Sequence, residues 1–218
     1  MIIKRIKLEN YTVFEDHQIE FDPGINIFIG EDGTGKTHLF KVLYSACQCV
    51  DQRVSFSHKL VSTMLPDDYK ISRLITRKQG NRSALIRIFA GERDVTQERV
   101  LSASFHGKTK KWDAEVTGEK GWDEPESNIN LSYISIIVEL LLELQRKGVQ
   151  VFVSTHDYMI ASYFEVRKAK NDSIAFHSLS HAGKTCDLIY EKKEKFADLK
   201  NNAIVSAFDK LLDEIYDL

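Results

Sequence analysis

The chain opens on alternating apolar and polar positions. The segment "IIKRIKL" (2–8) alternates, and "HQIEF" (17–21) follows after a polar break. A period of two is typical of a strand that buries one face. We therefore expect two strands here, paired as a hairpin or lying at the edge of a sheet.

A short apolar run follows the turn "DPG" (22–24). The run "INIFI" (25–29) predicts a buried strand that ends at Gly30, and an amphipathic pattern predicts a helix from Lys36 to about residue 51. Between them lies a glycine-rich segment. Strand, glycine-rich loop and helix stand in the order that phosphate-binding loops require.

The middle of the chain has a weaker pattern. Residues 52–80 predict a mixed loop and strand region, and "SALIRIFAG" (83–91) and "ERVLSASFHG" (98–107) predict paired strands of an antiparallel lobe. Residues 108–122 are polar and rich in turn formers, without a helical period or a strand core. Some of the basic residues cluster in "RKQGNR" (77–82), which favours a solvated turn over a nucleic-acid contact.

The last third of the chain is more regular. It predicts a helix, a near-continuous apolar strand of the parallel type, a second helix, a hairpin and a final amphipathic helix. In order, these elements cover 131–147, 149–155, 157–167, 173–191 and 194–217. The histidines of the hairpin, His177 and His181, have no third ligand nearby in sequence, so we interpret them as hairpin residues rather than a metal site.

Composition places the chain among ordinary globular proteins. It has 218 residues, 43% of them hydrophobic, and a net charge of −2, which suits one sizeable core or two small lobes. The near-neutral net charge gives no sign of a nucleic-acid-binding surface over the whole chain, although a local basic patch is still an alternative. The three cysteines, Cys47, Cys49 and Cys186, are an odd number, and the close spacing of Cys47 and Cys49 suits neither a disulfide nor a zinc half-site. We expect reduced thiols in a cytosolic protein.

No segment of the sequence predicts membrane insertion. Charges interrupt the N-terminus before an apolar run forms, so we expect no signal peptide. The most apolar segment, 131–147, contains Glu139 and Glu143 and is shorter than the roughly 20 residues that a membrane span needs. We expect a soluble, cytoplasmic protein without a membrane partner.

The segment "GEDGTGKT" (30–37) fits the phosphate-binding pattern G-x-x-x-x-G-K-[ST] without exception. Glycines let backbone N–H groups turn towards phosphate oxygens, and the helix N-terminus adds partial positive charge. The lysine would contact the β and γ phosphates, and the threonine hydroxyl would bind Mg²⁺. The alternative is a glycine turn that binds nothing. The predicted cofactor-binding residues are Gly30, Glu31, Asp32, Gly33, Thr34, Gly35, Lys36, Thr37 and His38.

Two further segments carry candidate chemistry. In "DEPE" (123–126), the first carboxylate would hold Mg²⁺ and the second would polarise a water molecule, unless this is merely a charged turn. In "VFVSTHD" (151–157), a buried strand brings His156 to its carboxyl end, where α/β sheets place their ligand chemistry. Alone, that histidine could be a capping or loop residue.

Residues 1–44, followed by "DEPESNINL" (123–131) and "STHD" (154–157), resemble the ABC-type ATPase heads of the SMC/RecF class and their AAA-labelled relatives. The resemblance covers residues 1–50 and 122–218. It implies an α/β P-loop NTPase of the ABC-ATPase type, with a mixed parallel core sheet, an antiparallel β lobe and flanking helices. ATP and Mg²⁺ would be the cofactors.

The resemblance also implies roles for single residues. Lys36 and Thr37 would bind nucleotide and Mg²⁺, Asp123 would support the metal, Glu124 would be the general base and His156 would sense the γ-phosphate. A D-loop facing a partner subunit would contain Ser127 and Asn128. Gln79 and Gln97 are both candidates for the Q-loop residue.

The sequence departs from the family pattern in its middle. We find no "LSGGE"-like signature: "LSHAG" (179–183) falls in the predicted hairpin, and "LSASF" (101–105) reads as strand. "TGEKG" (117–121) replaces the apolar strand expected before Asp123. Two hypotheses remain. Either a signature-bearing lobe and this strand were lost near residues 112–122, by degeneration or by engineering, or the head is complete but diverged.

We therefore expect one ABC-type head. An N-terminal lobe would cover residues 1–111, a connector or deletion junction 112–122, and a C-terminal lobe 123–218. The leading function is an ATP-driven dimerisation switch in DNA maintenance or phage defence, with a homodimer when ATP is bound if a signature surface exists. An effector protein and DNA are candidate partners. The alternatives are a nucleotide-binding subunit of an ABC transporter and a catalytically impaired interaction module, so ATP hydrolysis stays open.

Overall fold

The computed structural model describes residues 2–49, 54–78, 80, 83–93, 95–109, 115–117, 134–182, 187–200 and 202–216. The chain forms two compact units. The first unit contains Met1–Phe21 and Thr37–Glu126, and the second contains Asp22–Lys36 and Ser127–Leu218. This division differs from the two lobes predicted from the sequence, because residues 22–36 group with the C-terminal part of the chain.

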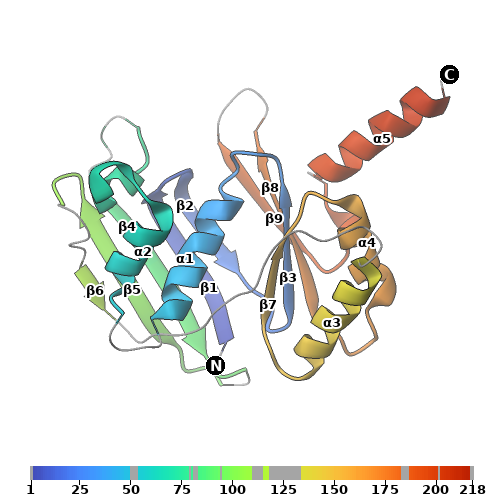
Figure 1. Cartoon of the computed structure of the whole chain (residues 1–218), viewed down its shortest axis with the longest axis horizontal. Coiled ribbons are helices and arrows are strands. Elements are labelled where there is room, and N and C mark those ends of the chain that lie inside the picture. The colour runs from blue at the N-terminus through green and yellow to red at the C-terminus, as the bar shows by residue number, and fades with distance from the viewer. Residues whose placement is uncertain are drawn as a thin grey trace. The chain divides into compact units, whose positions relative to one another are not determined.

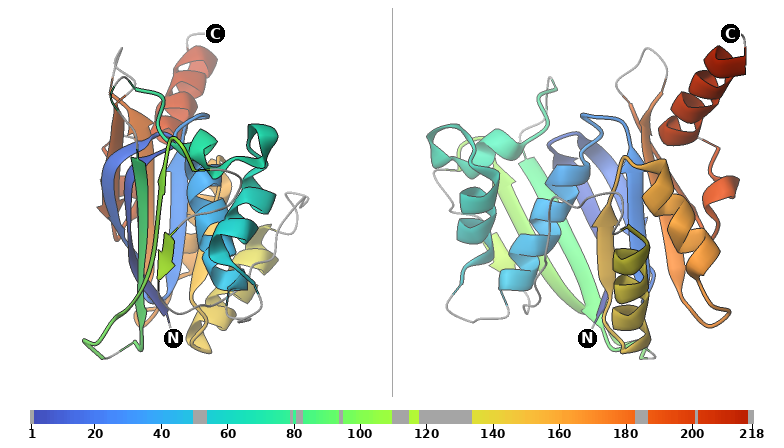
Figure 2. Two further views of the ribbon diagram at one scale, coloured as in Figure 1. Left: turned by 90° about the vertical axis from the view of Figure 1, so that its left-hand side faces the viewer. Right: turned by 45° about the vertical axis from the view of Figure 1, so that its right-hand side comes forward.

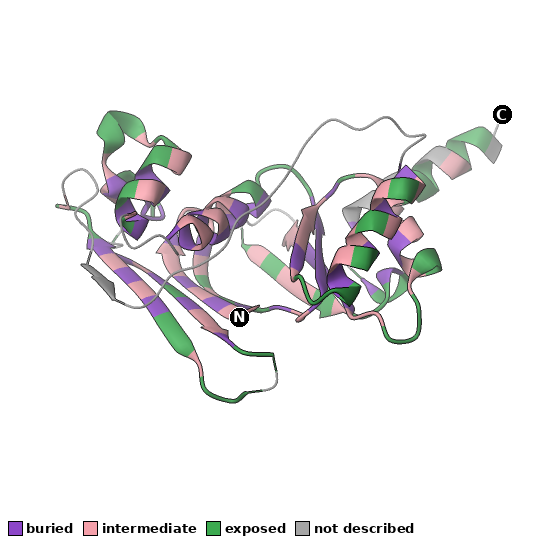
Figure 3. Cartoon of the chain, turned by 60° about the horizontal axis from the view of Figure 1, so that its bottom comes forward, coloured by how far each residue is buried: buried purple, intermediate pink, exposed green. Residues whose placement is uncertain are grey.

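The first unit is built on a five-stranded antiparallel sheet of order β2-β1-β4-β5-β6. Its strands are β1 (Ile2–Tyr11), β2 (Phe14–Glu20), β4 (Ser83–Gly91), β5 (Arg99–His106) and β6 (Glu115–Thr117). Buried and more exposed positions alternate along β4 and β5, as the sequence pattern predicts for half-buried strands (Figure 3). The predicted pairings of β1 with β2 and of β4 with β5 are confirmed. The short strand β6, which pairs with β5, was not predicted.

Helices α1 (Lys36–Gln48) and α2 (Phe56–Met64) lie on the same side of this sheet (Figure 2). The prediction of loop and strand for residues 52–80 was wrong, because α2 and the 3₁₀ turns η1 (Asp67–Tyr69) and η2 (Ile71–Leu74) lie there. Phe56, Leu60 and Val61 share one helical face and are buried. The helix ends at Met64, and the C-cap residue Leu65 has a left-handed conformation. Burial of this short apolar face within the unit therefore favours a helix over the loop or strand that the sequence predicted.

The second unit contains a four-stranded sheet of order β7-β3-β8-β9. Its strands are β3 (Ile25–Gly30), β7 (Val151–Ser154), β8 (Ile174–His181) and β9 (Leu188–Lys193) (Figure 1). Strand β3 is parallel to β7 and to β8, whereas β9 is antiparallel to β8. All six residues of β3 are buried, which is typical of a central parallel strand. This mixed sheet confirms the predicted parallel strands and the predicted hairpin.

Helices α3 (Ile134–Arg146) and α4 (Tyr158–Arg167) supply the main apolar cover of this sheet. The core of the unit joins alternate residues of β3 to the inner faces of both helices. Its central members are Ile25, Ile27, Ile29, Val138, Leu142, Ala161, Phe164 and Phe176. Both helices predicted from the sequence in this region are confirmed.

The predicted C-terminal helix begins later than expected. A 3₁₀ turn, η4 (Phe196–Asp198), precedes α5 (Ala203–Tyr216). The turn buries Phe196, whose backbone N–H donates to the Glu165 carboxylate at 3.0 Å. The Phe208 ring of α5 stacks on Tyr158 of α4 at a centroid distance of 4.6 Å. Burial of Phe196 therefore interrupts a pattern that is helical in the sequence alone.

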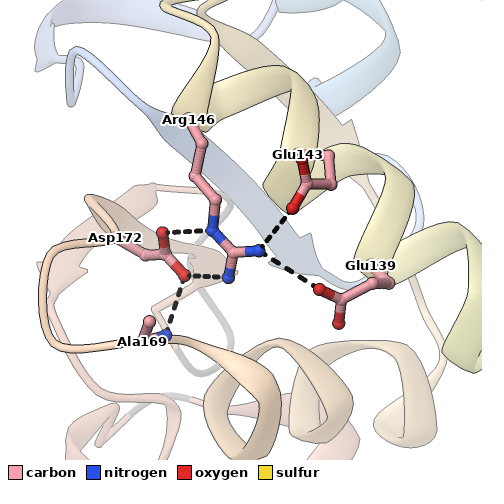
Figure 4. Close-up of polar contacts among 5 residues, drawn as sticks. All are labelled: Glu139, Glu143, Arg146, Ala169 and Asp172. Carbon is pink, nitrogen blue, oxygen red and sulfur yellow. Dashed lines mark hydrogen bonds and ion pairs between the residues drawn. The ribbon is translucent and has the colours of Figure 1, made fainter.

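One charged cluster connects the end of α3 to the turn between α4 and β8 (Figure 4). Arg146 donates from Nε to Asp172 Oδ1 at 3.0 Å and from a terminal nitrogen to Oδ2 at 2.7 Å. Asp172 also accepts the Ala169 backbone N–H, and its side chain is only 2% exposed. Glu139 and Glu143 contact the outer side of the same guanidinium. The Arg146 guanidinium holds the pKa of Asp172 below its ordinary value.

We expect Asp172→Asn to lower the free energy of unfolding by about 2 kcal/mol, because the substitution leaves Arg146 without its bidentate charged partner. A carboxyl with a lowered pKa stabilises the fold above its ordinary pKa and loses that effect as the pH falls through the lowered one. The difference between variant and wild type should therefore shrink in acid. Urea titrations at neutral and at strongly acidic pH measure it.

The control is Glu139→Gln, which removes a more exposed carboxylate from the same guanidinium. Exposed ion pairs contribute little, so this variant should lose less stability than Asp172→Asn. Equal losses in the two variants would contradict the special role of the buried carboxylate.

Candidate functional site

The glycine-rich segment forms a loop between β3 and α1. Strand β3 ends at Gly30 and the helix begins at Lys36. Gly33 and Gly35 have φ angles of 82° and 89°, a conformation that side chains other than glycine rarely adopt. A Cβ atom on Gly33 would meet no atom within 4 Å. Backbone conformation, rather than space, thus requires glycine at Gly33.

Gly30 is required for a different reason. It pairs with Leu179 of β8, and a Cβ atom on Gly30 would lie 2.1 Å from the Leu179 carbonyl oxygen. Such a contact is far inside van der Waals distance. The first glycine of the motif therefore permits the close approach of two parallel strands at the base of the loop.

The Lys36 side chain folds back on the loop. It is 6% exposed, and its Nζ donates to the carbonyl oxygens of Gly30 at 2.7 Å and Glu31 at 2.8 Å. Buried Thr34 donates from its hydroxyl to the same Glu31 carbonyl at 2.8 Å. Burial lowers the pKa of Lys36, and the charges of Asp32 and Glu31 partly oppose this shift. The ammonium is held at the loop, where an anion could replace its carbonyl partners.

Thr37 and His38 occupy the first turn of α1. Thr37 is exposed, whereas His38 is half-buried. Burial lowers the pKa of His38, and the positive charge of Lys41 lowers it further. His38 is therefore neutral at neutral pH and adds no positive charge at the N-terminus of α1. The exposed Thr37 hydroxyl is available to a ligand of the loop.

Two anchored neighbours position His156. The Thr155 N–H donates to the Phe28 carbonyl at 3.0 Å, which ties the end of β7 to β3. The Asp157 N–H donates to the Thr155 hydroxyl at 3.0 Å, and its carboxylate caps α4 by accepting the Met159 N–H at 2.7 Å. His156 itself is 57% exposed, and its Nε2 lies 3.7 Å from Asp32 Oδ1. The structure thus brings together His156 and the glycine-rich loop.

The remaining candidates cannot be placed in the same way. Asp123, Glu124, Ser127, Asn128 and Gln79 lie outside the described residues. Gln97 is exposed in the first unit. Among the described ranges, we find no group of three or more His, Cys, Asp or Glu side chains that could hold a metal ion. The roles of Asp123 and Thr37 in metal binding therefore stay predictions.

Of the two rejected signature segments, one lies wholly in a strand and the other begins at the end of a strand. "LSASF" (101–105) falls within β5, as predicted. Leu179 to His181 form the end of β8, and Gly183 lies outside the described residues. Neither segment stands at the start of a helix, which a γ-phosphate-binding signature would need.

The buried setting of His177 was not predicted from the sequence. It lies in the predicted hairpin, on β8, but its side chain is fully buried. Its Nε2 lies 3.0 Å from Asn26 Oδ1 and its Nδ1 lies 2.9 Å from the Tyr190 hydroxyl. The ring stacks on Phe28 of β3 at 4.3 Å. The near-continuous apolar run around His177 is the sequence signal that could have indicated burial.

The bonds of Asn26 define the protonation of this histidine. The Asp22 N–H donates to Asn26 Oδ1 at 2.7 Å, and Asn26 Nδ2 donates to the Asp22 carbonyl at 2.9 Å. Since Oδ1 is an acceptor, His177 Nε2 carries the proton and Nδ1 accepts from the Tyr190 hydroxyl. Burial lowers the pKa of His177 to about 3, with Lys192 adding to the shift. The neutral ring is a structural support beneath the loop strand.

Comparison with known proteins gives a family match over almost the whole chain. The family model AAA_23, described as an AAA domain, matches residues 5–217. Among curated proteins, the DNA replication and repair protein RecF of Streptococcus agalactiae serotype Ia is 33% identical over 88 residues. RecF of Clostridium kluyveri is 34% identical over 89 residues. These matches cover 40% and 41% of this chain but only 24% of each RecF.

Solved structures show the fold. An SMC head crystallised with the C-winged helix domain of ScpA matches 90% of this chain and 99% of its own, with a TM-score of 0.60 and 9% identity. The SMC head domain from Thermotoga maritima matches 89% of this chain and 100% of its own, with a TM-score of 0.56 and 9% identity. The predicted ABC-type fold class is confirmed. No helix among the described residues is long and apolar enough to span a membrane.

Proposed function

Because this chain belongs to the AAA_23 family of AAA domains and has the fold of an SMC head, we propose that it binds ATP with Mg²⁺ at residues 30–38. In this proposal, backbone N–H groups of the loop and the N-terminus of α1 surround the phosphates. Lys36 contacts the β and γ phosphates, and the Thr37 hydroxyl faces the metal. Mg²⁺ would supply positive charge that offsets the charge of the phosphates.

The conformation of the loop carries this proposal. Gly33 and Gly35 adopt left-handed angles, and the Lys36 ammonium rests on the carbonyls of Gly30 and Glu31. A simple glycine turn would not need a buried ammonium at its centre, since burying a charge is costly unless it is paired. The alternative of a glycine turn without a ligand is therefore not favoured.

Two further residues complete the proposed chemistry. His156, next to the loop, would contact the γ-phosphate, and Glu124 would act as the general base beside Asp123 at the metal. The sequence shows no signature segment. We therefore propose that this chain alone binds ATP more effectively than it hydrolyses it, and that ATP favours association of two heads if the missing surface is supplied.

We place this nucleotide switch in DNA maintenance. The support is the partial similarity to RecF, whose name describes DNA replication and repair, together with the SMC-head fold. The RecF matches span about a quarter of those proteins, so DNA and an effector protein are proposed partners. A transporter subunit is not favoured, because the two solved structures that match about 90% of this chain and are described above are SMC heads.

Among the described residues 30–38, Lys36 is the one charged side chain that is buried. We therefore expect Lys36→Ala to weaken the binding of a non-hydrolysable Mg²⁺–ATP analogue by about 100-fold or more. Isothermal titration calorimetry measures the affinity. Lys41→Ala, on the same helix, is the matched loss of charge and should change the affinity far less. Equal binding by wild type and Lys36→Ala, or no binding by wild type, would contradict the proposed function.

A further inference from the structure

The glycine-rich loop carries two carboxylates, Glu31 and Asp32, directly after Gly30. The Asp32 side chain is fully exposed, yet its Oδ1 lies 3.7 Å from His156 Nε2. This distance is longer than a hydrogen bond, and the two side chains form an ion pair when His156 is protonated. Glu31 is also exposed, but it makes its hydrogen bonds to Lys36 and Thr34 through its backbone carbonyl. Asp32 therefore has a specific side-chain neighbour in His156.

The backbone around His156 is anchored on both sides. Its neighbours Thr155 and Asp157 are tied to β3 and to the first turn of α4. The backbone on both sides of His156 is thus held, and only its side chain can change partner. Asp32 belongs to the loop that would receive the phosphates.

The charges of the loop oppose a polyanionic ligand. Residues 30–37 contain the carboxylates of Glu31 and Asp32 and the ammonium of Lys36. Both carboxylates act on Lys36, since they oppose the effect of burial on its pKa. A triphosphate bound at this loop would add negative charge near Asp32, and the repulsion between these like charges would weaken binding.

We propose that Asp32 sets the nucleotide affinity of the loop by holding His156 in the nucleotide-free protein. The inference rests on the proposed function, because it assigns the γ-phosphate to His156 as the competing partner. When a nucleoside triphosphate binds, His156 exchanges the Asp32 carboxylate for a γ-phosphate oxygen. A diphosphate offers no such oxygen, so the Asp32 contact persists. Asp32 then selectively weakens binding of the triphosphate.

The test compares Asp32→Asn with Glu31→Gln, which removes the same charge from the neighbouring residue. Exposed ion pairs change an equilibrium constant by up to about fivefold. We therefore expect Asp32→Asn to bind a non-hydrolysable Mg²⁺–ATP analogue about three- to fivefold more tightly than wild type does. The gain for Mg²⁺–ADP, and the gain from Glu31→Gln, should stay below about twofold.

His156→Gln separates the contact from general repulsion. In that background, Asp32→Asn should improve triphosphate binding by no more than Glu31→Gln does, because no His156 contact remains to be released. A gain of the same size in both backgrounds would mean that Asp32 acts through charge alone and would overturn the proposal. Unchanged or weaker triphosphate binding by Asp32→Asn would also overturn it.

A second measurement does not depend on nucleotide. The ¹⁵N resonances of the His156 ring should shift on Asp32→Asn, and much less on Glu31→Gln, in the nucleotide-free protein. Ring resonances that do not respond to Asp32→Asn would overturn the contact. Binding by wild type but not by Lys36→Ala, with no Asp32 effect, would remove this inference and leave the proposed function intact. No nucleotide binding by any variant would remove both.

Discussion

Replacing Gly30 with alanine is expected to lower the free energy of unfolding by about 3 kcal/mol or more, as overpacked backbone sites do. The added Cβ would lie 2.1 Å from the Leu179 carbonyl oxygen and 3.1 Å from the Thr34 hydroxyl. Backbone cannot rotate away as a side chain can. Strands β3 and β8 would have to separate at the base of the loop, so nucleotide binding should be lost as well.

The matched control for this substitution is Gly33→Ala. Gly33 has a left-handed φ of 82° but open space around it, so an added Cβ costs only backbone strain. That cost is about 1–2 kcal/mol. Urea unfolding followed by circular dichroism distinguishes the two effects. A loss in Gly33→Ala equal to or above the loss in Gly30→Ala would refute the steric explanation.

His177→Gln is expected to make the stability of the protein less sensitive to acid. Burial lowers the pKa of His177 from 6.5 to about 3 in the folded protein. The unfolded chain therefore binds more protons between these pH values, and stability falls as the pH drops through that window. The effect on the free energy of unfolding reaches about 5 kcal/mol at the acidic end and about 2 kcal/mol near pH 5.

Glutamine cannot titrate, but it can still donate towards Asn26. At neutral pH, the variant should be less stable than wild type by about 1–2 kcal/mol, because the hydrogen bond from Tyr190 and the stacking on Phe28 are weakened. Near pH 5 the two proteins should be closer in stability. Urea titrations at both pH values measure this convergence.

An exposed histidine provides the control for the pH series. His106 lies at the exposed end of β5, so His106→Gln should leave the pH dependence as it is in wild type. If His177→Gln also keeps the full acid-linked loss of stability, other groups must cause that loss. The buried, neutral His177 would then contribute nothing to the loss of stability in acid.

Local patterns predicted most elements and the glycine-rich loop of the P-loop motif. The alternation in 2–8, the apolar run 25–29 and the motif "GEDGTGKT" each depend on neighbours in sequence. Alternation reports one buried face of a strand, and glycine positions report backbone angles that other residues avoid. Both signals can be read from the sequence without knowledge of the rest of the fold. The ABC-type fold class and the SMC/RecF class came instead from the resemblance of residues 1–44, 123–131 and 154–157 to those heads.

The same patterns were wrong where burial overrode them. Residues 56–64 form α2 because Phe56, Leu60 and Val61 are covered on one side, although the surrounding sequence is mixed. The run 194–217 is helical only from Ala203, because burial of Phe196 imposes a 3₁₀ turn. Short segments contain too few residues for their hydrophobic period to determine their secondary structure. Tertiary packing determines it instead.

By itself, the sequence determined the phosphate-binding motif, the strand–loop–helix order around it and the absence of an "LSGGE"-like segment. Only the tertiary structure decided that Ile25 pairs with Val151 and Ile174, that Asp32 lies beside His156 and that His177 is buried against Asn26. The physical reason is the parallel sheet. Its register joins residues far apart in the chain, and no local period records which side chains then meet.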